Sequence, residues 1–305
     1  MKMPTLLTRI ALALGAGSMA WAQGPASPEG DVPFTPNGRV ALLTDYGVQD
    51  FYAGALKGAI ASRAPEALID DVTHGVPAFD IAGGAFLLSA AAREWPAGTV
   101  FTAIVDPGVG TERLPIVLRT GNGLVFVGPD NGLFTRVAVE MGIAEVREIA
   151  NEALLRPGAL SSTFHGRDLF GPIAGFLAAG GALSDVGPER GDIVRLRLVE
   201  PVFEHGEIRG QVLLADRYGN LLTNVPATLL AGQGIEQGAT LTLMVAGQTV
   251  SAPFVRTYGD AGVGENLCLI NSQGLLEFAT NQGDLAGTLG VNSGDEIRIR
   301  PGVFQ

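Results

Sequence analysis

The chain has 305 residues, of which 47% are hydrophobic and 17% charged, and its formal net charge is −11 at pH 7. This negative charge argues against binding of a nucleic acid as the main activity, because no cationic surface would attract the phosphates. The high apolar content excludes intrinsic disorder. The single cysteine, Cys268, excludes a disulfide framework, a cysteine-rich zinc module and an iron–sulfur cluster.

Residues 1–22 have the pattern of a secretory signal peptide. Lys2 and Arg9 precede a short apolar stretch, and Ala20-Trp21-Ala22 fits an A-x-A cleavage site. The apolar stretch is shorter than the ~20 residues that span a bilayer, which disfavours a membrane anchor. We therefore expect cleavage after Ala22, a flexible lead-in over residues 23–38, and a periplasmic or secreted mature protein without membrane association.

Strands and helices are predicted to alternate over residues 39–190. Apolar runs of strand length lie at 40–43, 67–71, 100–105, 116–118 and 124–127, and helical spacing covers 51–62, 81–93, 133–141 and 169–179. This alternation predicts an α/β domain with a mainly parallel sheet. Because ligands of such sheets bind at the carboxyl ends of the strands, polar residues at those ends are candidate site residues.

The pattern changes at a polar segment near residue 190. Residues 191–305 contain short alternating runs separated by Gly, Asn and Asp, namely 194–201, 210–216, 239–247, 267–271 and 295–301. No long helix is predicted there. This half is typical of a smaller all-β domain, an antiparallel sheet or barrel.

Polar clusters follow four of the predicted strands, and a fifth cluster opens a predicted helix. They are Thr44 to Gly47, Asp70 to His74, Asp106 to Arg113, Gly128 to Gly132 and Ser161 to Asp168. Each alone fits a turn or a helix cap. Their expected convergence at one sheet edge indicates a functional site.

The residue types in these clusters leave two chemistries open. The sequence has no GxxxxGK[ST], complete GxGxxG or GxSxG motif, which disfavours a phosphate loop, a dinucleotide site and an α/β-hydrolase. Carboxylates with Arg and His are able to position or deprotonate a water molecule. Alternatively, Asp45, Asp70, Asp71, His74 and Asp106 would form an oxygen-rich metal site.

Six motifs in chain order carry a family resemblance. They are TDYGxxDFYxGxxKG (44–58), DxTHxVPxFDIxxGAFLL (71–88), VDPGVGTER (105–113), VGPDNGL (127–133), FHGRDLFxP (164–172) and DRYGNLLTN (216–224). Together they resemble the S-adenosyl-L-methionine (SAM) hydroxide adenosyltransferases, also called adenosine-forming SAM hydrolases, which are relatives of the SAM-dependent fluorinases and chlorinases. The resemblance spans nearly the whole mature chain.

The resemblance implies an N-terminal α/β domain, a C-terminal β domain and a homotrimer that binds its ligand between neighbouring subunits. It implies attack of an activated water on the ribose C5′ of SAM, which releases adenosine and L-methionine. The sulfonium is already a cationic leaving group, so the reaction needs alignment of the water rather than an acid. No cofactor and no metal are expected.

Catalysis is assigned by this resemblance to Asp106, Arg113 and His165. Asp106 and Arg113 would orient the water, and His165 would help to polarise or deprotonate it. The halogenases have Tyr-Pro-x-Thr-Gly where this chain has Asp106-Pro-Gly-Val-Gly. A carboxylate at that position would repel a halide, which favours water as the nucleophile.

Substrate binding is assigned by the resemblance to five residues. Asp45 matches the aspartate that bridges the ribose hydroxyls, and Asp216 matches the carboxylate that holds the methionine ammonium. Asn220 matches an adenine-edge contact, and Tyr218 stands at or near the aromatic stacking position. Ser272 matches the serine that contacts the methionine carboxylate.

Four further side chains have a structural as well as a functional interpretation. Phe79 and Phe254 occupy aromatic positions of the family and could equally be core residues. We expect His74 to be a hydrogen-bonded structural histidine and His205 to be solvated in a surface turn.

Hydrolysis of SAM is thus the leading hypothesis, and three alternatives remain open. The protein could be an exported nucleoside- or SAM-binding protein without turnover, a SAM-dependent halogenase, or a metallohydrolase. Export also leaves the physiological substrate open, because SAM is mainly a cytosolic metabolite. An exported enzyme could scavenge released SAM or act on another 5′-substituted adenosine.

Overall fold

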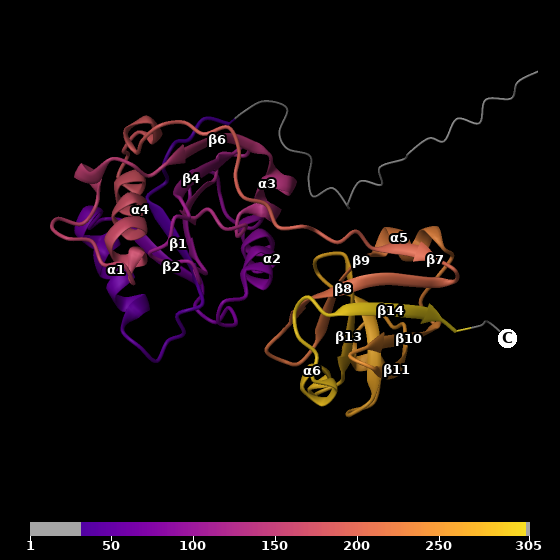
Figure 1. Ribbon diagram of the computed structural model, residues 1–305. Coiled ribbons are helices and arrows are strands. Elements are labelled where there is room, and N and C mark those ends of the chain that lie inside the picture. Colours follow the sequence, from indigo (N-terminus) through magenta and orange to yellow (C-terminus); the bar gives the residue numbers. More distant parts are fainter. Residues whose placement is uncertain (1–31, 303–305) are drawn as a thin grey trace, which may run out of the picture.

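The computed structural model describes residues 32–302, and the predicted signal peptide lies outside this range. An N-terminal α/β domain and a C-terminal β domain lie side by side and are joined by an extended segment (Figure 1). Among the described residues, no helix is long and apolar enough to cross a membrane.

The N-terminal domain contains one six-stranded sheet with helices on both faces. Its strands are β1 (Arg39–Thr44), β2 (Leu68–Thr73), β3 (Val100–Ile104), β4 (Pro115–Thr120), β5 (Val125–Pro129) and β6 (Ile143–Glu148), in the order β2-β1-β3-β5-β4-β6. Neighbouring strands from β2 to β5 pair in parallel, whereas β4 pairs antiparallel with both β5 and β6. The predicted mainly parallel α/β domain is therefore confirmed. Strand β6 was not predicted, because only Val146 of this strand is buried and its sequence shows no apolar run.

Successive residues of β1 point to opposite faces of this sheet. Val40 and Leu42 belong to the core beneath α1 (Tyr52–Arg63) and α4 (Gly171–Ala178). Ala41 and Leu43 belong to the core beneath α2 (Ile81–Ala92) and α3 (Thr135–Met141). Because both faces are covered, the strand is a continuous apolar run rather than an alternating one.

The C-terminal domain is an antiparallel, nearly closed barrel, as predicted. Its elements are β7 (Val202–Glu204), β8 (Glu207–Ala215), β9 (Leu221–Pro226), α5 (Ala227–Gly232), β10 (Thr240–Val245), β11 (Gln248–Pro253), β12 (Asn266–Ile270), β13 (Leu275–Thr280), α6 (Leu285–Leu289) and β14 (Glu296–Pro301). The strand order is β11-β10-β14-β8-β9-β13-β12, and β7 pairs with β8. A bridge between Phe254 and Cys268 connects the end of β11 to β12, so the two edges of the sheet meet.

The alternating run 194–201 does not form the strand that its pattern suggested. The backbone N–H of Val194 donates to the Asp130 carboxylate, and that of Leu196 donates to the Thr135 hydroxyl. The Leu196 side chain packs against the core of the N-terminal domain. These backbone groups thus bond side chains of the α/β domain instead of a neighbouring strand.

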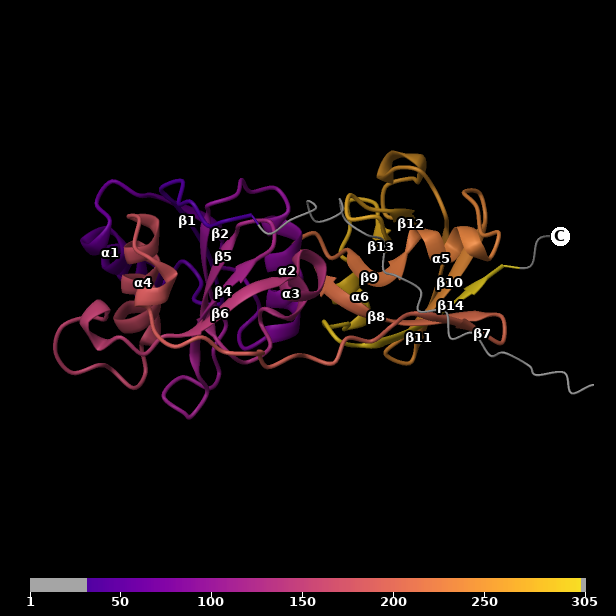
Figure 2. The same ribbon diagram turned by 90° about the horizontal axis from the view of Figure 1, so that it is seen from above.

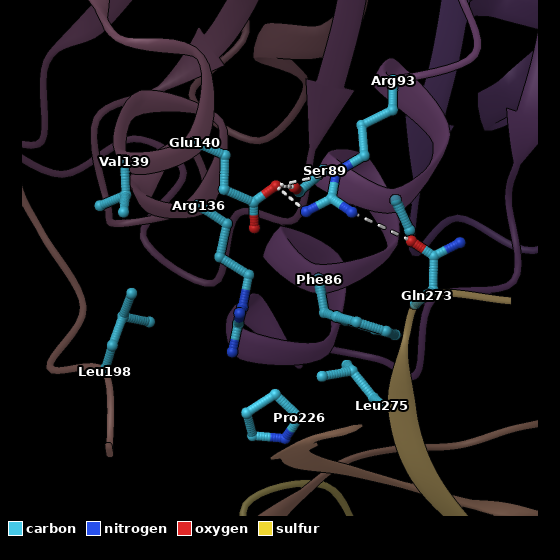
Figure 3. A pocket seen from close by; sticks show the side chains of 11 residues that line it. Phe86, Ser89, Arg93, Arg136, Val139, Glu140, Leu198, Pro226, Gln273 and Leu275 are labelled. Atoms are coloured by element: carbon cyan, nitrogen blue, oxygen red, sulfur yellow. Dashed lines mark hydrogen bonds and ion pairs between the residues drawn. The ribbon is translucent and has the colours of Figure 1, made fainter. Parts of the chain in front are cut away.

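Helix α2 forms the main contact between the two domains (Figure 2). Phe86 of α2 is buried against Leu213 and Leu214 of β8. Figure 3 shows polar side chains beside this contact: Glu140 of α3 accepts hydrogen bonds from Ser89 and Arg93, and Arg93 reaches Gln273 of the β12–β13 turn at 3.5 Å. A single chain therefore holds its domains together through an apolar contact with a polar border.

Candidate functional site

A cavity of about 390 Å³ opens at the carboxyl ends of β1 and β3. This volume is within the usual range of small-molecule sites. Its walls combine two carboxylates and an imidazole with several aromatic rings. The lining residues are Asp45, Tyr46, Tyr52, Ala78, Phe79, Ile104, Asp106, Val109, Thr163, Phe164, His165 and Gly166. The expected convergence of polar clusters at this sheet edge is thus observed for the clusters that follow β1 and β3 and for the cluster that precedes α4.

Asp106, Arg113 and His165 form one hydrogen-bonded group. The Nε of Arg113 lies 3.0 Å from both carboxylate oxygens of Asp106, and its Nη2 lies 2.5 Å from Oδ2. The same Nη2 lies 2.7 Å from Nδ1 of His165. Only 9% of the Arg113 side chain and 5% of the Asp106 side chain are exposed, so this ion pair is screened from water. The guanidinium is further packed over the ring of Phe170.

The contact with Arg113 determines which nitrogen of neutral His165 carries the proton. Arginine has donors and no acceptor, so Nδ1 of His165 must accept. The proton of the neutral ring is then on Nε2, the free nitrogen of the ring. Burial and the adjacent Arg113 charge lower the pKa of His165, so the ring is neutral at pH 7.

A five-residue π-helix, Gly166–Phe170, holds His165 at its N-terminal end. Pro172 has no N–H to donate to the carbonyl of Asp168, and that carbonyl instead accepts from the backbone N–H of Arg156 at 3.0 Å. The buried Asp168 carboxylate accepts from the backbone N–H of Ser161 and from Arg167. These hydrogen bonds fix both ends of the loop that carries His165.

The loop from Asp106 to Arg113 packs directly against the His165 loop. Gly110 has a φ of +78°, and a Cβ atom there would overlap the carbonyl oxygen of Ser162. Only glycine combines this backbone conformation with this close approach. Gly110, which the sequence indicated as a turn residue, therefore allows the Asp106–Arg113 loop and the His165 loop to pack together.

Asp45 also lines the cavity and directly follows β1. Its Oδ2 accepts from the backbone N–H of Phe79 at 2.9 Å. Phe79 is 70% exposed, has a positive φ of 68° and lines the cavity, so it is not a core residue. Phe254, the other ambiguous aromatic residue, is buried in the core of the barrel.

The remaining acidic and histidine residues of the second cluster form ion pairs and hydrogen bonds. The two ring nitrogens of His74 contact the Thr44 hydroxyl and the Asp71 carboxylate, so the structural interpretation of this histidine is confirmed. Asp71 also accepts from Lys57, and Asp70 pairs with Arg39. Burial opposes ionisation of Asp71, but Lys57 and His74 hold its pKa below the ordinary value. Within residues 32–302, no three His, Cys, Asp or Glu side chains are grouped as ligands of a metal ion.

Asp216, Tyr218 and Asn220 lie in a second pocket, on the C-terminal domain. Oδ1 of Asp216 accepts from the backbone N–H groups of Tyr218 and Asn220, and Oδ2 accepts from the Asn220 side chain. Tyr218 is 76% exposed and free to contact a ligand. Asp284 lines the same pocket, which therefore has an acidic wall.

Ser272 lies in the exposed turn between β12 and β13 and lines neither pocket. Beside this turn, the buried Glu277 accepts from the hydroxyl of Tyr258 and from Asn271. Burial raises the pKa of Glu277. His205 is exposed in the β7–β8 turn, as expected.

Two family models match the chain: the SAM hydroxide adenosyltransferase N-terminal domain over residues 40–187 and the C-terminal domain of the same family over residues 210–298. This chain belongs to the SAM hydroxide adenosyltransferase family. The two family domains coincide with the α/β sheet and with most of the barrel.

Several curated proteins match this chain over nearly their full length. An (R)-S-adenosyl-L-methionine hydrolase from Salinispora arenicola is 40% identical, and the match covers 86% of this chain and 98% of the relative. A Thermus thermophilus protein of the same name is 35% identical, with 85% and 98% covered. A fluorinase from Actinoplanes sp. is 30% identical, with 88% and 99% covered.

The fold of this family member is also similar to solved structures. The crystal structure of an uncharacterized conserved protein from Thermotoga maritima superposes with a TM-score of 0.81 at 39% identity, and it covers 86% of this chain and 99% of that protein.

Several residues of the two pockets were not identified from the sequence. Tyr46 and Tyr52 line the cavity, and Tyr258 with Glu277 supports the second site. Tyr46 could have been found from its place beside Asp45 at a strand end. No local sequence pattern distinguishes Glu277 from an ordinary strand residue, because its burial depends on the closure of the barrel.

Proposed function

We propose that this protein hydrolyses SAM to adenosine and L-methionine by attack of water on the ribose C5′. The observation that carries this proposal is the Asp106–Arg113–His165 group in the wall of a cavity of nucleoside size. The family membership and the names of the curated relatives support it.

In the proposed reaction the triad aligns one water molecule with the C5′–S bond. Arg113 holds the Asp106 carboxylate, which accepts one proton of the water. The Nε2–H of His165 donates to the water oxygen, because Nδ1 is occupied by Arg113. This arrangement favours a polarising role for His165 over a deprotonating one.

The bond changes then balance without a general acid. A lone pair of the water oxygen forms the C5′–O bond, and the electron pair of the C5′–S bond leaves with sulfur. The sulfonium becomes the neutral thioether of methionine, and the proton lost by the water passes to Asp106. Alignment of the water supplies the main rate enhancement.

We infer that both pockets bind parts of one substrate. Asp45 would accept hydrogen bonds from the ribose hydroxyls in the first cavity. In the second pocket, Asp216 would hold the methionine ammonium, Asn220 would contact the adenine edge and Tyr218 would stack on the base. Ser272 would contact the methionine carboxylate. The acidic wall of the second pocket suits a cationic ligand.

We further propose a homotrimer in which these pockets face each other across subunits. Asp106 and Asp216 line different pockets of one described chain, so one ligand that needs both groups requires a second subunit. A heterologous interface that closes as a ring would repeat this pairing at each contact.

We propose that the enzyme acts outside the cytoplasm, in the periplasm or after secretion. This proposal depends on the leader pattern of residues 1–22 in the sequence. N-terminal sequencing of the exported protein should begin at Gln23. Recovery of an intact leader would contradict cleavage.

The activity is tested by incubating the purified protein with SAM and separating the products by chromatography. We expect equimolar adenosine and methionine, and no product from the Asp106→Ala/His165→Ala double variant. We also expect no effect of a chelator, and no chlorinated nucleoside when chloride is added. Binding without turnover would indicate a binding protein, loss with chelator a metallohydrolase, and halide-dependent consumption a halogenase.

A further inference from the structure

Tyr46 is held in a defined position in the wall of the cavity. It directly follows Asp45, and its backbone N–H donates to the Thr44 hydroxyl at 3.2 Å. The next residue, Gly47, has a φ of +67° and donates to the carbonyl of His74. The Tyr46 ring packs against the rings of Tyr52 and Phe164 at centroid distances of 5.9 and 6.0 Å. The phenol therefore has little freedom to move.

The hydroxyl of Tyr46 lies next to the residue that follows His165. A Cβ atom on Gly166 would overlap the Tyr46 Oη, because the distance between the two atoms would be shorter than that of real Cβ contacts. Ile104, the last residue of β3, lies against the same point. The hydroxyl is thus between the end of β3, which leads to Asp106, and the start of the π-helix, which follows His165.

Among residues 32–302, no side chain or backbone group forms a hydrogen bond with this hydroxyl. Burial, and then the negative charges of Asp45 and Asp106, raise the pKa of Tyr46 far above its ordinary value. The phenol is therefore neutral throughout the physiological pH range, and it both donates and accepts hydrogen bonds. A neutral hydroxyl in a wall of charged groups is suited to bind water.

We propose that the Tyr46 hydroxyl is a further catalytic group, which binds the nucleophilic water beside Asp106 and His165. This proposal rests on the proposed hydrolysis of SAM. A water molecule has two protons and two lone pairs. Asp106 accepts one proton, Tyr46 Oη accepts the other, and the Nε2–H of His165 occupies one lone pair. The remaining lone pair is then directed at C5′.

The same geometry explains why glycine follows His165. An alanine at position 166 would displace the Tyr46 hydroxyl, although no positive φ requires glycine there. A phenylalanine at position 46 would keep the ring contacts with Tyr52 and Phe164 and would lose only the hydroxyl. Tyr46→Phe therefore separates water binding from packing.

The kinetic test compares Tyr46→Phe with the wild type in adenosine release from SAM. We expect kcat to fall roughly tenfold, the equivalent of one lost hydrogen bond, with KM unchanged within about twofold. A purely structural role would lower the melting temperature or raise KM instead. An unchanged kcat would overturn the proposal.

A double-mutant cycle with Gly166→Ala provides the matched control. Gly166→Ala alone should lower kcat at least as much as Tyr46→Phe, because its methyl group displaces the hydroxyl. In the Tyr46→Phe background the same substitution should cost less than about twofold, since the overlapping oxygen is gone. Full additivity of the two losses would contradict the proposed contact.

Crystal structures of the wild type and Tyr46→Phe with adenosine make the test independent of turnover. We expect an ordered water within about 3.2 Å of Tyr46 Oη in the wild type, and its loss in the variant. If the wild type releases no adenosine, the proposed function fails, but this water still decides the binding role of Tyr46. Its absence from the wild type would overturn the inference.

Discussion

At the scale of single residues, the chemistry of the site depends on the charge next to His165. Arg113 donates to Nδ1 and remains protonated, so a proton on His165 would be placed beside an existing positive charge. The neutral imidazole is therefore the resting form. The proposed role of His165 as a donor through Nε2 does not require the ring to titrate.

We predict that His165 titrates below the ordinary histidine pKa of about 6.5. Because burial and then Arg113 lower its pKa, the neutral ring persists as pH falls through 6.5 and is lost only below it. The acid limb of kcat/KM should therefore lie below pH 6.5. NMR of the imidazole carbons measures the titration directly, and Arg113→Met should raise the pKa. A wild-type value above 6.5 would contradict this account.

The same shift has a consequence for folding stability. A group whose pKa is lower in the folded state binds fewer protons there than in the unfolded chain. The contribution of neutral His165 to stability is thus present above the unfolded pKa and is lost as pH falls through the folded value.

At the scale of elements, the π-helix depends on one buried carboxylate. The Asp168 side chain is fully buried and joins Arg167, the Ser161 backbone and Arg156. Hydrogen bonds from Arg167 and from the Ser161 backbone hold the pKa of Asp168 below its ordinary value. This stabilisation is present above the unfolded pKa of about 3.9 and is lost as pH falls below it.

We predict that Asp168→Ala lowers the free energy of unfolding by about 3 kcal/mol, because it leaves buried donors without their acceptor. Arg156→Met is the matched control: its side chain is 49% exposed, so its loss should cost less than about 1 kcal/mol. Urea unfolding measures both. Equal effects of the two substitutions would show that the buried carboxylate is not the main support.

At the scale of the whole molecule, α2 connects the sheet of one domain to the barrel of the other (Figure 2). We predict that Phe86→Ala destabilises this contact by about 3 kcal/mol through the cavity that it leaves. Calorimetry should then resolve separate transitions of the two domains. Val139 of α3 lines the pocket of Figure 3 together with Phe86 but is 52% exposed, so Val139→Ala should leave one transition.

The proposed trimer is tested by combining two variants, each of which we expect to be inactive by itself. Asp106→Asn should disable the first pocket and Asp216→Asn the second. If each active site joins two subunits, co-expression should restore activity at about a quarter of the sites, those that combine two intact pockets. No restoration, or a monomer by analytical ultracentrifugation, would contradict shared sites.

Part of the fold and of the site could be predicted because the relevant signals are local. Burial on both faces makes β1 a continuous apolar run, and the alternation in β10 reports one buried face. Asp45 and Asp106 were candidates because they lie in polar clusters at the ends of predicted strands, and the family resemblance supplied their expected roles. The run 194–201 was misleading because its alternation is satisfied by the neighbouring domain rather than by a strand.

The sequence by itself determined the two fold classes, the strand-end location of the first cavity and the residue types of the triad. Only the tertiary structure decided that Arg113 occupies Nδ1 of His165, that the Tyr46 hydroxyl faces Gly166, and that Asp216 lines a separate pocket. The physical reason is that sequence patterns report only on residues that are close together in the chain. Hydrophobic period and turn residues report local burial, whereas the distance between two side chains far apart in the chain depends on how whole elements pack.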